Sequence, residues 1–111
     1  MPHLVIRGIS VEQTKTISNA LVQKLSDLCD CELDNFTLEV LQSTFVFDQK
    51  EVPGYPFIEV KWFDRGKAIQ DRFAQIITMQ VHLLGIPEVE VAFTAYSESK
   101  YYLNEKSFAD F

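Results

Sequence analysis

The strongest constraint on the fold of this chain is an internal duplication, in which a strand, a helix and a second strand occur twice in the same order. The first copy begins with Pro2–Arg7 (PHLVIR) and the second with Pro56–Lys61 (PFIEVK). Each segment places proline first, then mainly apolar residues typical of β-strands, and then a basic residue. At 111 residues, the chain predicts one domain, 1–111, with a core that needs neither disulfides nor metal.

A helix is expected after the first strand of each copy. Ser10 and Gln13 form a capping-box pattern at the start of the first helix. Gly85 and Pro87 are expected to end the second. Apolar residues recur at steps of three and four along both segments, as on the buried face of a helix. They are Ile17, Leu21, Leu25 and Leu28 in the first, and Ile69, Phe73, Ile76, Ile77 and Leu84 in the second, interrupted at Gln80.

Each helix leads into another strand, predicted at 35–40 in the first copy and at 88–93 in the second. We expect the strand of the first copy to extend through Phe45 and Phe47, with a bulge near Gln42. Pro53-Gly54 is a strong turn signal in the loop between the copies. The boundaries are therefore 2–47 and 56–96 for the two β-α-β repeats and 97–111 for an aromatic C-terminal tail.

Two topologies of the α+β class have this order of elements. Two β-α-β units, each with parallel strands, can join into a four-stranded sheet with both helices on one face. The ferredoxin-like fold has the same element order with its strands arranged differently. Periodicity does not separate the two, although the proline-led strands favour the duplicated arrangement.

The sheet face without helices is expected to be buried between subunits. Alternating with apolar residues along the strands are side chains too polar for a deep core: Thr37, Glu39, Glu59, Lys61 and Glu90. The aromatic residues Phe45, Phe47, Trp62 and Phe63 also predict more apolar surface than a monomer of this size exposes. Burial of such a face between subunits usually produces a closed symmetric assembly.

Charge and composition exclude several function classes. A net charge of −6 leaves no basic stripe for nucleic-acid phosphates, so no nucleic-acid partner is expected. No apolar run approaches the roughly 20 residues that span a bilayer, and no basic and apolar signal peptide opens the chain. We therefore expect a cytoplasmic protein without a membrane partner. The local cluster of Lys61, Arg65 and Lys67 is either a site for a small anion or a solvated helix entrance.

Pro2 is a candidate catalytic base, because removal of Met1 would leave its ring nitrogen as the free α-amine. An ordinary α-amine titrates near ~7.7–8.0, and burial in an apolar pocket lowers that pKa. An N-terminal proline at the start of a buried strand could then take protons from carbon near pH 7.

The other reactive side chains predict no metal and no cofactor. Cys29 and Cys31 lie one residue apart, closer than zinc ligands usually do, and we interpret Cys29 as packing at the end of the helix. Strand alternation points His3 away from the face of Pro2, and His82 complements the helix C-terminus. Phosphate-binding and dinucleotide motifs are absent from the sequence.

The residues described so far resemble the tautomerase superfamily, which includes 4-oxalocrotonate tautomerase and macrophage migration inhibitory factor. The resemblance rests on Pro2, the duplicated β-α-β pattern, the segment 57–67 (FIEVKWFDRGK) and the tail 101–108 (YYLNEKSF). It implies a homotrimer whose sheets surround a central barrel, with active sites at subunit boundaries and without cofactors. The N-terminal proline would act as a general base, or as an acid in the dehalogenase and decarboxylase members.

The resemblance also assigns roles to other residues of the chain. Arg65 and Lys67 are similar to the basic pair at the second helix entrance of malonate semialdehyde decarboxylase-like members, so they would hold the substrate carboxylate, with Lys61 as a third choice. Phe108 would close the pocket, with Tyr101 or Tyr102 beside it.

Three positions depart from the best-known members of the superfamily. Ile9 stands where 4-oxalocrotonate tautomerase has an arginine, and Glu32 stands where migration inhibitory factor has a pocket lysine. The pocket asparagine of the latter falls near Ala92 or Thr94.

The leading hypothesis from the residues and the resemblance together is a trimeric tautomerase acting on a small carboxylated carbonyl or enol substrate. The alternatives are a non-catalytic trimeric binding module and a ferredoxin-like dimeric regulatory domain.

Overall fold

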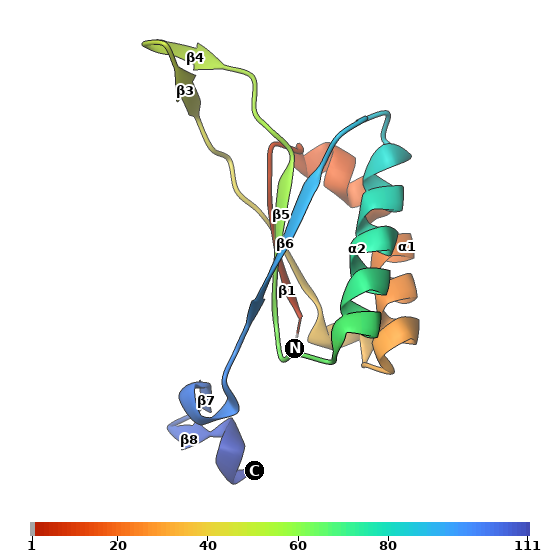
Figure 1. Ribbon diagram of the computed structural model, residues 1–111, viewed down its shortest axis with the longest axis vertical. Coiled ribbons are helices and arrows are strands. Elements are labelled where there is room, and N and C mark those ends of the chain that lie inside the picture. Colours follow the sequence, from red (N-terminus) through yellow and green to blue (C-terminus); the bar gives the residue numbers. More distant parts are fainter. Residues whose placement is uncertain (1) are drawn as a thin grey trace.

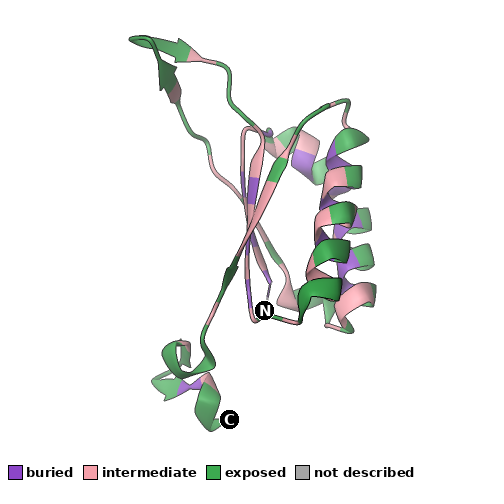
Figure 2. Cartoon of the chain, viewed as in Figure 1, coloured by how far each residue is buried: buried purple, intermediate pink, exposed green. Residues whose placement is uncertain are grey.

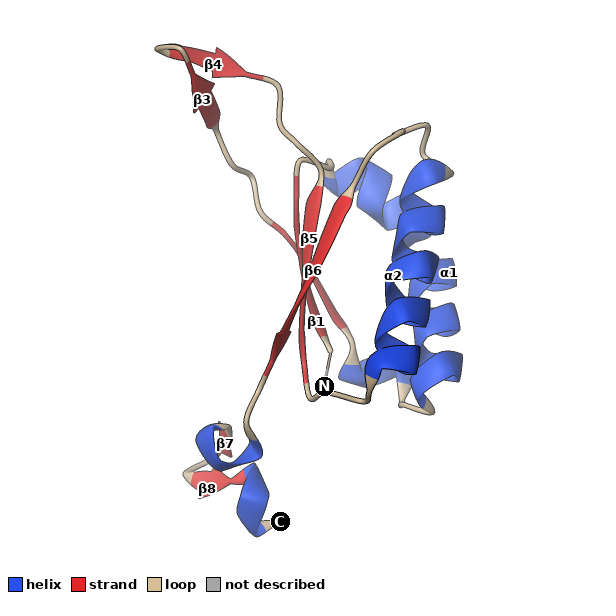
Figure 3. Ribbon diagram, in the orientation of Figure 1, coloured by secondary structure: helices blue, strands red, loops and turns tan. Residues whose placement is uncertain are grey.

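The computed structural model describes residues 2–111. Two long helices and a four-stranded sheet form its body, and two small hairpins project from it (Figure 1, Figure 3). The elements in chain order are β1 (His3–Arg7), α1 (Val11–Cys29), η1 (Leu33–Asn35), β2 (Thr37–Val40), β3 (Phe45–Phe47), β4 (Lys50–Val52), β5 (Phe57–Trp62), α2 (Lys67–His82), β6 (Glu90–Ala95), η2 (Glu98–Lys100), β7 (Tyr102–Leu103), β8 (Lys106–Ser107) and η3 (Phe108–Asp110).

The strand order β2-β1-β5-β6 confirms the duplicated arrangement. β1 is parallel to β2, β5 is parallel to β6, and the two units join through the antiparallel pair β1–β5. A ferredoxin-like sheet would instead be antiparallel throughout, with the two strands of each β-α-β unit separated by a strand of the other unit. Both helices cover the same face of the sheet, as the α+β prediction requires (Figure 1).

The core lies between that face and the helices. Strand alternation directs every second residue of β1 and β5 toward the helices, where those side chains are almost completely buried. The predicted helix stripes meet them, with Leu28, Ile69, Ile76 and Leu84 at the half-buried margin. The central buried residues are Leu4, Ile6, Leu21, Leu25, Ile58, Val60, Trp62, Phe73, Ile77 and Val81.

Trp62 corrects one expectation, because only 1 % of it is exposed and it contributes no interface surface. It continues the inward alternation of Ile58 and Val60 along β5. Its ring lies between those of Phe73 and Phe93, with centroids 4.9 and 5.0 Å away. The Trp62 side chain, which we expected at a subunit contact, therefore packs against aromatic neighbours in the core.

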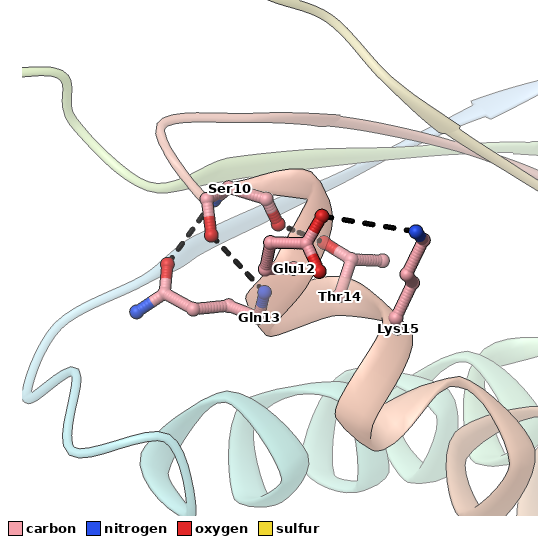
Figure 4. A network of polar contacts seen from close by, with 5 residues as sticks. All are labelled: Ser10, Glu12, Gln13, Thr14 and Lys15. Atoms are coloured by element: carbon pink, nitrogen blue, oxygen red, sulfur yellow. Dashed lines mark hydrogen bonds and ion pairs between the residues drawn. The ribbon is translucent and has the colours of Figure 1, made fainter.

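The capping box at the start of α1 is confirmed (Figure 4). The Gln13 amide donates to Ser10 Oγ at 3.0 Å, and the Ser10 amide donates to Gln13 Oε1 at 3.1 Å. Two amide groups that the first helical turn leaves without partners are thereby satisfied. The cap holds the sharp connection from β1 into α1.

The predicted extension of the strand after the first helix is wrong. β2 ends at Val40, and β3 pairs with β4 in a separate two-stranded hairpin. Its turn lies at Asp48 and Gln49, both with positive φ, as in a type I′ turn, and not at Pro53-Gly54. The hairpin stands away from the body, leaving Val46 68 % and Phe47 75 % exposed (Figure 2).

The end of α1 holds a third correction. Cys29 is half-buried beside the core, as expected, but its sulfur is also bonded to that of Cys31. Asp30 between them adopts the left-handed conformation with φ of 55°. This turn closes the helix and directs the chain into η1 and then β2.

The face of the sheet opposite the helices carries the polar residues that the sequence placed there. Arg7 and Glu59 form an ion pair of 3.4 Å across β1 and β5, and the guanidinium also lies 4.8 Å from the centre of the Phe57 ring. Most of this face is only half-buried, because neither α1 nor α2 covers it (Figure 2). We call it the open face.

Gly8 provides a test of this fold, because it has φ of +79° and its α-carbon lies against the Tyr55 backbone. A Cβ there would overlap the Tyr55 carbonyl oxygen. Gly85 is a matched control, with φ of +82° but nothing within 4 Å of an added Cβ. In denaturant unfolding, we expect Gly85→Ala to lower the free energy of unfolding by about 1 kcal/mol and Gly8→Ala to lower it by about 3 kcal/mol. Equal losses of stability in the two variants would contradict the close approach of Gly8 to the Tyr55 backbone.

Candidate functional site

Pro2 lies immediately before β1 and is less than 2 % exposed. Its carbonyl oxygen accepts a hydrogen bond of 3.2 Å from the Thr37 amide, so the parallel pairing with β2 holds it in place. Extending the β1–β5 register by one residue puts Pro2 opposite Trp62. It therefore lies at the end of the sheet where β5 leads into α2 (Figure 1). Met1, whose removal would free the ring nitrogen, lies outside the described residues.

His3 follows Pro2 on the open face, away from the core, as alternation predicts. It pairs with Lys61 in the register, and its Nε2 lies 3.4 Å from the Tyr101 hydroxyl. Burial lowers the pKa of His3 below 6.5. The positive charges of the chain's amino terminus and Lys61 lower it too, while Glu39 raises it. Neutral imidazole is thus the favoured form near pH 7.

The C-terminal tail brings four aromatic rings together beside this end of the sheet. Phe63 and Phe108 are stacked, with ring centroids 5.6 Å apart. Tyr101 lies 5.1 Å from Phe63 and 4.6 Å from Phe108, and Tyr96 lies 5.0 Å from Tyr101. We call these four residues the aromatic cluster. Burial and the neighbouring Tyr101 raise the pKa of Tyr96, so its hydroxyl stays protonated over a wide pH range.

The start of α2 carries the basic residues. Gly66 precedes the helix with φ of 91°, and its amide donates to Asp64 Oδ1 at 2.8 Å. The first turn of α2 has neither an acidic residue nor a side-chain cap, so its amides are free to bind an anion. Arg65 Nη1 donates to the Phe63 carbonyl at 3.0 Å, and Lys67 Nζ lies 2.6 Å from Asp71 Oδ1.

These contacts link the predicted site residues in two groups. His3, which follows Pro2 in the chain, pairs with Lys61 in the register and contacts Tyr101, while Phe63 contacts Arg65 through its carbonyl and Phe108 through its ring. Lys67 is turned toward Asp71 on the exposed helix surface and joins none of them. Sequence reasoning missed Tyr96, although it follows β6 directly and its amide extends the ladder to the Trp62 carbonyl at 2.7 Å.

The grooves of the isolated chain lie elsewhere. One of them, of about 720 Å³, is at the opposite end of β1, between 8–12 and 40–45. Pro2, Arg65 and Tyr101 line neither this groove nor three others of the chain, so none of these four encloses Pro2.

Two further features bear on the chemistry. Within residues 2–111, no three histidine, cysteine, aspartate or glutamate side chains gather as ligands of a metal ion would. In the same range, no helix has the length and hydropathy needed to cross a membrane.

Comparisons with known proteins agree with this architecture. Residues 1–107 match the family model described as a domain of unknown function, DUF1904. A crystal structure of a DUF1904 domain from Sebaldella termitidis is 34% identical, with a TM-score of 0.89, covering 97% of this chain and 100% of that one. No curated protein matches the chain.

Two more distant structures show the same fold. The macrophage migration inhibitory factor-like protein of Entamoeba histolytica is 21% identical, with a TM-score of 0.72, covering 96% of this chain and 98% of that one. Pt0534 inactivated by 2-oxo-3-pentynoate is 13% identical, with a TM-score of 0.77 and 96% of each chain covered. The tautomerase-like fold inferred from the sequence is thereby confirmed.

Phe63 offers a test of the aromatic cluster, since its ring meets Tyr96, Tyr101 and Phe108. Aromatic pairs contribute about 0.5–1.5 kcal/mol each, so Phe63→Leu should increase amide hydrogen exchange throughout 97–111 by roughly tenfold. Tyr102→Leu is the control, because the Tyr102 side chain is 63 % exposed. The same increase in both variants would contradict a tail anchored by the Phe63 ring.

Proposed function

This chain belongs to the DUF1904 family, and we propose that it is a cofactor-independent tautomerase that uses Pro2 as a general base on a small carboxylated carbonyl or enol compound. The observation that carries the proposal is the position of Pro2. It is buried at the start of β1, at the end of the sheet where the basic start of α2 and the aromatic cluster also lie.

This position suits proton abstraction from carbon. Once Met1 is removed, the ring nitrogen of Pro2 is a secondary amine held in one direction. Burial disfavours its charged form, and the cationic side chains of Lys61 and Arg65 at the same end act in the same sense. The neutral amine would take a proton from the carbon beside the carbonyl, and the electron pair would move onto the carbonyl oxygen. The protonated amine would then give the proton to the enolate oxygen or, where a double bond is conjugated with the enolate, to the far carbon of that double bond; ketonisation of an enol is the reverse of the first path.

Arg65 is our first choice for holding the substrate carboxylate. A guanidinium grips a carboxylate with two parallel hydrogen bonds, and the uncapped amides of α2 add donors. Lys61 lies beside His3 and would stabilise the developing enolate. Lys67 is the weaker candidate because Asp71 already neutralises it. Tyr101 and Phe108 would form the apolar wall.

We propose a homotrimer, because two features of the chain are incomplete by themselves. The open face is a sheet surface without a covering layer, and sheets of this kind bury such a face against another element. The grooves described for the single chain also leave Pro2 outside them. A closed ring of three sheets would cover the open face and complete a pocket at each subunit boundary.

A 2-oxo acid is the substrate class that fits these residues best. It carries a carboxylate for Arg65 and a carbonyl that acidifies the neighbouring carbon. Pt0534, which shares the fold, is inactivated by 2-oxo-3-pentynoate, itself a 2-oxo acid.

A non-catalytic trimeric binding module is the second candidate. Ile9 and Glu32, together with Ala92 or Thr94, stand where the better-known tautomerases that the chain resembles carry basic or amide pocket residues. Such a module would keep the fold and bind a small carboxylate without turning it over.

Replacing Pro2 by Ala tests the proposal. Because a positioned general base contributes about 10²–10⁴-fold, ketonisation of an enolpyruvate-type substrate should slow by that factor. Mass spectrometry of the N-terminus should show Met1 removed from the wild-type chain, and circular dichroism should show that the variant is folded. Unchanged ketonisation by Pro2→Ala would overturn the proposed role.

Arg65 and Lys67 should differ in their effects on substrate binding. A charge-assisted hydrogen bond contributes about 1.5–3 kcal/mol, so Arg65→Ala should raise KM by roughly 10- to 150-fold. Lys67→Ala, which removes a side chain already paired with Asp71, should change KM much less. Steady-state kinetics with a carboxylate substrate and its amide gives the comparison. An Arg65→Ala variant whose KM for the carboxylate stays that of the wild type would assign the anion site elsewhere.

A further inference from the structure

His3 is the point where the C-terminal tail meets the central strand. Its Nε2 lies 3.4 Å from the Tyr101 hydroxyl, and its ring stands edge-on to that of Tyr96, at 5.9 Å and 85°. Tyr96 and Tyr101 lie at the two ends of the segment that contains η2. One imidazole therefore contacts both ends of the segment that turns the chain from β6 into the tail.

This contact is polar in an otherwise apolar attachment. Within residues 2–111, the pair His3–Tyr101 is the one side-chain hydrogen bond that joins the tail to the sheet. The other polar side-chain contacts of the tail lie inside it, such as Ser107 to the Glu98 carbonyl at 3.1 Å. The tail is otherwise attached by the contacts of the Phe63 ring with Tyr96 and Phe108, and by the backbone hydrogen bond from the Tyr96 amide to the Trp62 carbonyl. The hydrogen bond thus directs rings that apolar contact alone would leave free to shift.

We propose that His3 is a positioning residue that, as neutral imidazole, accepts the Tyr101 hydroxyl and holds the aromatic cluster at the end of the sheet where Pro2 lies, and that its protonation releases the tail. The attachment of the tail is independent of any reaction. Its consequence for turnover rests on the tautomerase function proposed above.

The chemistry of imidazole explains the release. Neutral imidazole has one nitrogen that accepts a hydrogen bond, whereas both nitrogens of the cation are donors. A protonated His3 could only donate to the Tyr101 oxygen, so the hydroxyl would have to turn its own proton away, and the new charge would be held in a half-buried position facing Lys61 on β5 and the chain's amino terminus. Glu39 on β2 is the neighbouring group that would favour the cation.

The direction of the pH dependence follows from the pKa of His3. Burial lowers it below 6.5 in the docked state, and release of the tail would return it toward that ordinary value. The released state therefore binds the proton more strongly. Docking is complete above pH 6.5 and weakens as the pH falls from there through the lowered pKa of docked His3.

Nuclear magnetic resonance on the substrate-free protein tests this mechanism. Ring-to-ring Overhauser effects between Phe63 and Phe108 report docking, and the His3 imidazole signals report its protonation. Both would be followed from about pH 7.5 to about pH 5, a range that brackets an ordinary histidine pKa. In the wild type we expect loss of the Overhauser effects with the same midpoint as His3. Overhauser effects between Phe63 and Phe108 that persist after His3 is protonated would overturn the proposal.

Three variants separate the hydrogen bond from simple packing. His3→Gln keeps a side-chain acceptor that does not titrate, so the tail should stay docked throughout the range. His3→Leu removes the acceptor and should weaken the Overhauser effects at every pH. Tyr101→Phe removes only the hydroxyl, so the midpoint of His3 should rise toward its ordinary value. The proposal is wrong if His3→Gln loses docking with the wild-type midpoint.

The pH profile of kcat/KM links the attachment to turnover. Wild-type kcat/KM should fall at acid pH with two contributions, protonation of the Pro2 amine and protonation of His3, and in His3→Gln only the Pro2 contribution should remain. A pH-dependent tail in a protein without tautomerase activity would refute the proposed function alone. Tautomerase activity that depends on Pro2, with a tail indifferent to His3 protonation, would refute the positioning role alone.

Discussion

The antiparallel pairing of β1 with β5 is the contact on which the rest of the structure depends. It joins two β-α-β units that could not close a sheet separately, with His3 opposite Lys61 and Arg7 opposite Phe57. On one face, this register aligns the apolar residues that both helices cover. On the other, it aligns the charged residues of the open face. A shift of one residue would exchange the two faces and bury those charges in the core.

The same register creates the candidate site. It brings the N-terminal end of β1 beside the C-terminal end of β5, so Pro2 lies near the residues that lead into α2. The tail, although distant in the sequence, returns to this place because Phe63 and His3 offer it rings and a hydrogen bond. The fold therefore places a candidate base, cationic side chains and aromatic rings at one end of one sheet.

Much of this arrangement could be predicted from the sequence, because it depends on local periodicity. The stripes of both helices, the capping box at Ser10 and the proline-led strands are short-range patterns, and they led to the correct topology. The hairpin β3–β4 was missed because two non-glycine residues, Asp48 and Gln49, form its turn. Trp62 and the His3–Tyr101 contact were missed because residue type does not reveal which long-range partner a side chain meets.

The pKa of the Pro2 amine tests the central claim most directly. Of the four prolines in the chain, only Pro2 can carry a titrating amine, so ¹⁵N-proline labelling isolates it in a nuclear magnetic resonance titration. A general base at this buried position should titrate clearly below the ordinary α-amine range of about 7.7–8.0. A pKa within that range, or a chain that retains Met1 and shows no proline amine, would contradict catalysis by Pro2.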